Sequence, residues 1–199
     1  RYLTGVSSGV STVTSMAGDG KGNLWFGSFG GLVRFNNETD TYQVFRHNPN
    51  DPNSLRSNRV SSLFLDRADR FWIGFEDQGV GLMLAYTEDR LLVEPFTHQA
   101  FDPHSLSHNA IRAIYEDEGG LLWFGTQGGG VSKGNPATRA FGHYQHDPGN
   151  PNSPAGENIT ALAFDAPRRS LWIGTGGNGL DRMDLITGEF VHYRHNPED

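Results

Sequence analysis

The stretch Asp19-Gly-Lys-Gly-Asn-Leu-Trp-Phe-Gly27 decides the fold, because close copies of it recur three more times in this chain of 199 residues. Successive tryptophans of the four copies are separated by 47, 51 and 49 residues. A period of this size indicates one supersecondary unit repeated four times. The repeated tryptophans and the aspartates that precede them are Trp25, Trp72, Trp123, Trp172, Asp19, Asp66, Asp117 and Asp165.

Each copy contains four short runs of β-branched, aromatic and aliphatic residues, separated by turn residues and without helical periodicity. Four antiparallel strands in about 50 residues are typical of a β-propeller blade. We therefore predict an all-β fold, a β-propeller with four blades in this chain that is part of a larger ring. The predicted blades cover residues 10–48, 58–98, 109–147 and 158–195, and residues 1–9 are expected to supply part of a closing strand.

The repeated residues have predicted structural roles. The tryptophan should lie on the second strand and fill the gap between neighbouring blades. The glycine two residues later should stand where no side chain fits, and the aspartate should hydrogen-bond its own turn. Two copies depart from the pattern: Arg70 is read as replacing the turn glycine, and Pro167-Arg-Arg-Ser170 lengthens the fourth turn.

Composition narrows the classes of function. A net charge of −7 without a basic cluster speaks against nucleic acid and anionic membranes as partners. The lack of cysteine excludes disulfides and thiolate metal sites. The chain begins without methionine and stops as a loop begins, so we expect an excised or processed fragment. An open arc of four blades would expose apolar faces, which makes missing blades its expected partners.

Neither a metal nor a cofactor is predicted. The histidines that recur once per copy, His47, His98, His146 and His195, end the outermost strands of four different blades. They should lie far apart, whereas zinc holds its ligands within ~2.1 Å. The stretch Asn48–Ser54 offers oxygen ligands for calcium, but a proline-stiffened loop capped by its own Asx side chains fits it better.

The candidate ligand site is the face that carries the starts of the inner strands and the glycine turns between second and third strands. Polar residues there vary between copies while the frame does not, as an asymmetric ligand on a symmetric frame requires. The alternative is that they cap strands and satisfy turns. The candidates are Asn58, Arg59, Glu76, Asp77, Gln78, Asn109, Arg112, Gln127, Asn158, Thr160 and Asn178. No catalytic residue is predicted, because neither G-x-S-x-G nor H-E-x-x-H occurs.

With these residues laid out, the repeat resembles the two-component regulator propeller repeat, with the signature D-x-x-G-x-L-W-[IF]-G-T. Asp19–Gly27 fits it almost completely, Asp117–Thr126 fits nearly as well, and Asp51-Pro-Asn-Ser-Leu55 resembles its inter-blade linkers. The resemblance implies a non-catalytic ligand-sensing domain on the periplasmic side of an inner-membrane bacterial receptor, often a ring of about seven blades. A β-sandwich spacer, one membrane helix and a cytoplasmic output domain typically follow, and related sensors bind oligosaccharides.

The partners expected from this resemblance are a small molecule or oligosaccharide, the missing blades, the downstream domains and a second receptor in a homodimer. Two other classes stay open. A propeller lyase would place a histidine, acids and a metal at the central funnel, and the position of His104 and His108 in a linker weakens that interpretation. A protein-interaction scaffold would use the same face for another chain.

Overall fold

The computed structural model describes residues 12–135, 138 and 140–195. The strands of this part of the chain form four separate four-stranded antiparallel sheets, one for each copy of the repeat. They belong to two compact units of two sheets each, Arg1–Phe96 and Thr97–Asp199. The all-β prediction of propeller blades is therefore confirmed. The closing strand expected from residues 1–9 lies outside the described residues.

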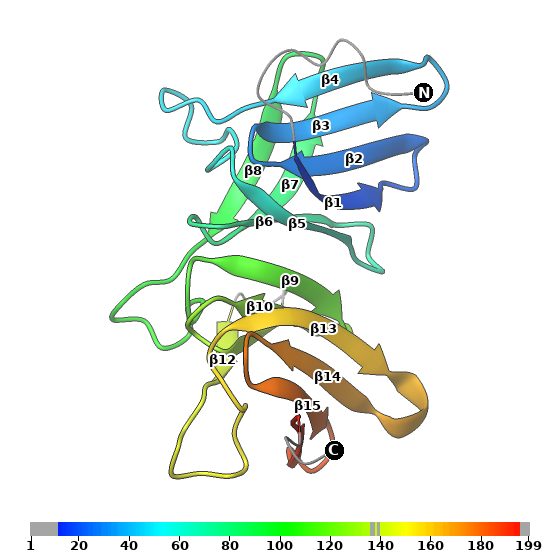
Figure 1. Ribbon diagram of the computed structural model, residues 1–199. Helices are drawn as coiled ribbons and strands as arrows, with labels where there is room; N and C mark the ends of the chain where they lie inside the picture. Colours follow the sequence, from blue (N-terminus) through cyan, green and yellow to red (C-terminus); the bar gives the residue numbers. More distant parts are fainter. Residues whose placement is uncertain (1–11, 136–137, 139, 196–199) are drawn as a thin grey trace. The chain divides into compact units, whose positions relative to one another are not determined.

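In the first unit, each sheet follows the chain from its inner to its outer strand, so every connection joins neighbours. The inner strands β1 and β5 of the two blades lie side by side (Figure 1). The strands are β1 (Val13–Gly18), β2 (Asn23–Ser28), β3 (Gly31–Asn36), β4 (Thr41–Phe45), β5 (Val60–Leu65), β6 (Phe71–Phe75), β7 (Val80–Tyr86) and β8 (Leu91–Phe96).

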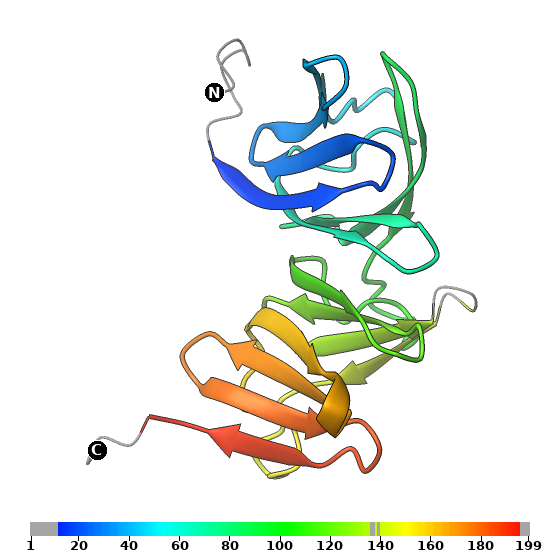
Figure 2. The same cartoon turned by 90° about the vertical axis from the view of Figure 1, so that its right-hand side faces the viewer.

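The second unit repeats this arrangement, with the inner strands β9 and β13 packed against each other. Figure 2 shows its last sheet, β13 to β16, with all four strands in chain order. The elements are β9 (Ile111–Glu116), β10 (Leu122–Thr126), β11 (Val131–Asn135), β12 (Ala140–Tyr144), β13 (Ile159–Asp165), the 3-10 turn η1 (Ala166–Arg168), β14 (Ser170–Thr175), β15 (Gly179–Asp184) and β16 (Phe190–Tyr193).

Trp25 and Trp123 fill the gap between the two blades of their units, as predicted. Trp25 on β2 is fully buried, and its ring centroid lies 5.5 Å from Phe71 and 5.1 Å from Tyr86 in the following blade. In the second unit, Trp123 is also fully buried, in a cluster with Leu171 of β14 and other residues of the last blade. Large apolar rings at this place join two sheets that have no backbone hydrogen bonds between them.

The repeated aspartates hold both their own turns and the tryptophan rings. The indole Nε1 of Trp25, Trp72 and Trp123 donates to Oδ2 of the aspartate six residues earlier, at 3.0, 2.8 and 2.9 Å. The other oxygen accepts from the turn backbone, as in Asp19 Oδ1 with the N–H groups of Lys21 and Asn23. The turn prediction is confirmed, and the bond to the ring was not foreseen.

Asp19 shows how such a carboxylate stays charged. Its burial opposes ionisation, but hydrogen bonds from the Trp25 indole, the Asn23 amide and the turn backbone outweigh burial and lower the pKa of Asp19. Each of the first three blades thus contains a small polar core of carboxylate, indole and backbone amides.

The glycine after each tryptophan occupies a place without room for a side chain. A Cβ on Gly27 would lie 2.7 Å from Cγ1 of Val60, and one on Gly125 would lie 2.7 Å from Cγ2 of Ile159. Both contacts are with the first residue of the neighbouring inner strand, so glycine sets the distance between blades. The prediction for this glycine is confirmed at these two positions.

The turn prediction for Arg70 is wrong. The residue three places before the tryptophan is left-handed in each of the first three turns, namely Gly22, Asp69 and Gly120, with φ of 84°, 58° and 78°. Asp69 therefore replaces the glycine, since an aspartate tolerates this conformation better than most residues. Arg70 stands one place further on, where its Nε donates to Asp66 Oδ2 at 2.7 Å. In the fourth turn, Arg169 takes the left-handed conformation, with φ of 48°.

The linker histidines fasten the loops between blades. Nδ1 of His47, His98 and His146 lies 2.5, 2.7 and 2.7 Å from the carbonyl oxygen eight residues further on. The first loop is also capped by its own side chains, with Asn48 Oδ1 accepting from the N–H of Asn50 at 3.0 Å. This confirms the self-capped loop that the sequence favoured over a calcium loop.

Candidate functional site

Every inner strand begins with a β-bulge on the candidate face. The pairing with the second strand skips one residue at the same place in each copy, namely Thr14, Ser61, Arg112 and Thr160. A bulge leaves its extra residue unpaired and re-aims the side chain. The repeat thus provides one re-aimed position per blade, which holds threonine in two copies, serine in one and arginine in one.

In the first unit, Arg59 and Glu76 form an ion pair beside an exposed aromatic ring. Arg59 Nε donates to Glu76 Oε2 at 2.9 Å, and Nη2 reaches the same oxygen. The Glu76 side chain is 10% exposed and that of Arg59 58%. The guanidinium also lies 5.4 Å from the ring centroid of Phe29, which is 47% exposed. We call Phe29, Arg59 and Glu76 the first cluster.

Phe29 is not among the predicted site residues, because the prediction named only polar residues on the candidate face. It follows Ser28 at the end of β2, as Glu76 follows Phe75 and Gln127 follows Thr126 in the next two copies. An exposed phenylalanine where the other copies carry polar residues was the available signal.

In the second unit, Arg112 and Gln127 meet in the same way. Nη2 of Arg112, on the bulge of β9, donates to Oε1 of Gln127 at the glycine turn. The N–H of Gln127 donates to the carbonyl of Ala110 at 2.8 Å, which fastens this turn to the start of its own inner strand. We call Arg112 and Gln127 the second cluster. Since the clusters lie in different units, each is a separate candidate site here.

The two asparagines at the starts of inner strands also have structural roles. Oδ1 of Asn58 accepts from the N–H of His47, and Oδ1 of Asn109 from that of His98, both at 2.7 Å. The alternative interpretation, that these residues cap strands, therefore holds for the side-chain oxygens of both asparagines. Their role toward a ligand stays a prediction.

The remaining candidates lie near these places, and their side chains make no hydrogen bond with the described residues. Asp77, Asn158, Thr160 and Asn178 are exposed, and Gln78 is half-buried. The carbonyl of Asn158 accepts from the N–H of Gly176 at 2.8 Å, so the start of β13 is fastened to the last glycine turn. These side chains add polar groups around a face whose backbone is held in place.

The two clusters differ in the groups that they present. The clusters combine guanidinium, carboxylate and amide groups with one exposed ring, and they show no nucleophile aligned with a base. Within the described ranges, no group of three or more His, Asp or Glu residues is gathered as a metal site would require. The described residues also include no helix that is long and apolar enough to cross a membrane.

Comparison with known proteins agrees with the repeat. The sequence pattern of the family described as two component regulator propeller matches residues 7–30, 54–77 and 105–128. A curated protein named histidine kinase P4, from Formosa agariphila, is 34% identical over 94 residues, which are 47% of this chain and 7% of that protein.

Two solved structures share the fold. The extracellular domain of a protein described as a hybrid two component system of B. thetaiotaomicron superposes with a TM-score of 0.79 at 22% identity, over 92% of this chain and 24% of that one. PorZ, a surface component of the type-IX secretion system of Porphyromonas gingivalis, gives 0.68 at 16% identity, over 100% of this chain and 30% of that one. The chain thus spans less than a third of each.

Sheet topology, the aspartate–tryptophan pair and the periodic glycine define a class of protein, the β-propellers built from short sequence repeats. Within that class, the repeat is that of the two component regulator propeller family, whose sequence pattern matches three of its copies in this chain.

Proposed function

We propose that this chain is the ligand-sensing, non-catalytic part of a bacterial membrane receptor, placed on the periplasmic side of the inner membrane. The single observation that carries the proposal is the contrast between a repeated frame and a face that changes from copy to copy. Trp25 and Trp123 have the same partners in their blades, whereas the bulge residue is a threonine in β1 and an arginine in β9.

The chemistry of the face favours a polyhydroxylated ligand such as an oligosaccharide. The exposed ring of Phe29 offers an apolar surface for the face of a sugar ring. Arg59 and Glu76 offer donors and an acceptor in a fixed geometry, because each orients the other. Arg112 and Gln127 offer the same kinds of group in the second unit. A fixed set of polar groups beside an apolar surface is the usual composition of a small-molecule site.

A saccharide array tests the proposal. The unmodified chain should bind one saccharide class, and Arg59→Ala and Arg112→Ala should weaken that binding without lowering the melting temperature. Asp77→Ala, an exposed change on the same face, tests whether any charge suffices. Turnover of a saccharide in a chelator-sensitive manner would contradict the proposal and favour the lyase class. Capture of a protein partner with no saccharide bound would favour the scaffold class.

We also propose that a further blade packs on the last sheet of this chain. Val131 and Trp123 are fully buried between the two blades of the second unit. At the matching positions of the last blade, Leu180 is 39% exposed and Trp172 is half-buried, beside a Tyr193 that is 45% exposed. The exposed face of the last sheet thus carries the same types of apolar residue that are buried between the blades of the second unit, as expected for an interface whose partner blade is absent.

The extended chain tests this second proposal. Adding a further repeat of this family after residue 199 should protect the Trp172 indole from exchange and raise the melting temperature. Trp172 that stays as accessible as before would contradict it. The result is independent of saccharide binding, because the interface and the candidate face use different residues.

A further inference from the structure

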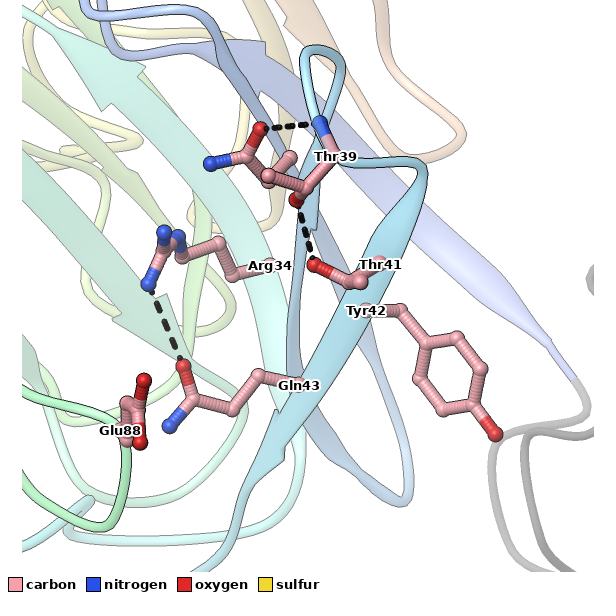
Figure 3. Close-up of a pocket in the computed structure, with 7 residues that line it drawn as sticks. Arg34, Thr39, Thr41, Tyr42, Gln43 and Glu88 are labelled. Atoms are coloured by element: carbon pink, nitrogen blue, oxygen red, sulfur yellow. Dashed lines mark hydrogen bonds between the residues drawn. The ribbon is translucent and has the colours of Figure 1, made fainter.

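A polar pocket of about 550 Å³ lies at the outer part of the first blade, away from the glycine turns. Strands β3 and β4 and their turn supply most of its wall, and the turn after β7 supplies Glu88. Figure 3 shows Arg34, Gln43 and Glu88 close together, with Thr39 and Thr41 above them and Tyr42 directed to the other side of β4.

Arg34 is held in one orientation by three contacts. Its Nε donates to Asn23 Oδ1 at 2.9 Å, and its Nη1 donates to Gln43 Oε1 at 3.3 Å. Its guanidinium carbon lies 4.7 Å from the ring centroid of Tyr86. Gln43 is in turn oriented by its Nε2, which donates to the carbonyl of Thr87 at 3.0 Å. A guanidinium has five N–H donors, and these two bonds leave three of them for a ligand.

The positive charge of Arg34 has no carboxylate partner among the described residues. Both oxygens that it contacts belong to neutral amides, and the third contact is an aromatic face. A cation that is fixed and not neutralised is suited to a carboxylate, which it can bind in a bidentate manner.

The other polar groups of the wall mostly satisfy one another. Asn36 Oδ1 accepts from the N–H of Thr39 at 3.1 Å, and the hydroxyls of Thr39 and Thr41 lie 2.7 Å apart. Glu88 differs, since it is exposed and makes no hydrogen bond or ion pair with any residue that the structure describes. The groups with remaining capacity are therefore one cation and one anion, and both lie close to the Gln43 amide (Figure 3).

This arrangement occurs in one copy among the four described sheets. The residue paired with the tryptophan across the second and third strands is Arg34, Leu82, Lys133 and Arg182 in chain order. The residue opposite it on the outer strand is Gln43, Glu94, Gly142 and Val191. The arginine–glutamine pair is thus not needed to build a blade.

We propose that this pocket binds a free α-amino acid, with its carboxylate on the Arg34 guanidinium and its ammonium group on the Glu88 carboxylate. A simple anion would meet repulsion from Glu88, and a simple cation would meet repulsion from Arg34. A zwitterion pairs with both groups and leaves no charge unpaired. The site is separate from the first cluster, so it does not depend on the saccharide proposal.

Calorimetric titration with each proteinogenic amino acid tests this site. At least one should bind with a Kd of about 1 mM or lower, the range expected for a small ligand held by two charge pairs. Its amide, which lacks the carboxylate, and its N-acetyl form, which lacks the ammonium group, should each bind about tenfold more weakly.

The variants separate a bound zwitterion from a general salt effect. Two variants should each weaken binding about tenfold. Glu88→Gln removes the negative charge at an exposed turn, and Arg34→Lys keeps the positive charge but loses the paired N–H donors that bind a carboxylate in a bidentate manner. Glu38→Gln, an exposed acid in the β3–β4 turn of the same blade, is the matched control and should bind as the unmodified chain does. No binding by any amino acid at about 10 mM, or binding that Glu88→Gln leaves unchanged, would overturn the proposal.

Discussion

Replacing Asp66 by alanine should show how much one repeated aspartate stabilises its blade. Its side chain is fully buried, and its two oxygens accept four hydrogen bonds. Oδ1 accepts from the N–H groups of Ala68 and Arg70, both at 2.9 Å. Oδ2 accepts from Trp72 Nε1 at 2.8 Å and from Arg70 Nε at 2.7 Å.

The four bonds are not of equal weight. Trp72 is 2% exposed, so its indole N–H would lose its acceptor without access to water, at a cost of ~1–3 kcal/mol. Arg70 is 33% exposed and can turn to solvent, and the two turn amides are partly buried. Adding ~0.5–1 kcal/mol for the turn amides gives a loss of about 3 kcal/mol in the free energy of unfolding for Asp66→Ala. Asp66→Asn, which keeps one oxygen, should lose about half as much.

Urea unfolding, combined with hydrogen exchange of peptides from the first unit, measures this loss. Asp165→Ala is the internal comparison, because Asp165 lies in the last blade beside a half-buried Trp172 and pairs with the exposed Arg168. The loss for Asp165→Ala should be clearly smaller. A loss below about 1 kcal/mol for Asp66→Ala, or equal losses at both positions, would refute the view that the buried indole depends on its aspartate.

Other predictions follow from single contacts. Gly125→Ala places a Cβ 2.7 Å from Ile159 Cγ2 and should lower the free energy of unfolding in urea by ~1–3 kcal/mol. Gly142→Ala is the control, because open space surrounds Gly142, and it should leave this free energy unchanged or slightly higher. His192 places Nδ1 2.7 Å from buried Asp181 Oδ1 and Nε2 2.8 Å from the Pro151 carbonyl, and these bonds raise the pKa of His192. The stabilisation that charged His192 provides should be complete below its ordinary pKa of 6.5 and should be lost as pH rises through the raised pKa. The melting temperature of His192→Gln should lack this loss. Parallel pH profiles of the melting temperature for the two proteins would contradict the prediction. His98→Ala should speed amide exchange in residues 99–106, because Nδ1 no longer fastens the loop to the Leu106 carbonyl; unchanged exchange would show that the loop is held by its other bonds.

The frame was predictable because its cause is periodic. Tryptophan and glycine recur at fixed offsets, and the structure forms one four-stranded sheet for each copy. The bond from indole to aspartate was not predictable by periodicity, since it depends on the turn bringing residues six apart within 3.0 Å. The error at Arg70 has another cause, a misalignment by one residue, because Gly22, Asp69 and Gly120 each stand three residues before their tryptophan.

The face was predictable in position but not in contacts. Variable residues at strand starts pointed to Arg59 and Arg112, and the structure gives each a partner at the glycine turn of its own blade. The bulge that re-aims Arg112 leaves no mark in residue type, so the sequence could not show it. The amide oxygens of Asn58 and Asn109 accept hydrogen bonds from the backbone N–H groups of linker residues eleven positions earlier, and only the folded structure shows these bonds.

The central claim is that a constant frame presents a variable binding face, and NMR titration with a saccharide library tests it most directly. The indole N–H signals of Trp25, Trp72 and Trp123 report the frame, because each is held by a buried aspartate. The account predicts that a bound saccharide shifts signals of Phe29, Arg59, Glu76, Arg112 or Gln127 and leaves the three indoles unmoved. Shifts centred on the indoles, or a library in which no saccharide shifts the face, would contradict it.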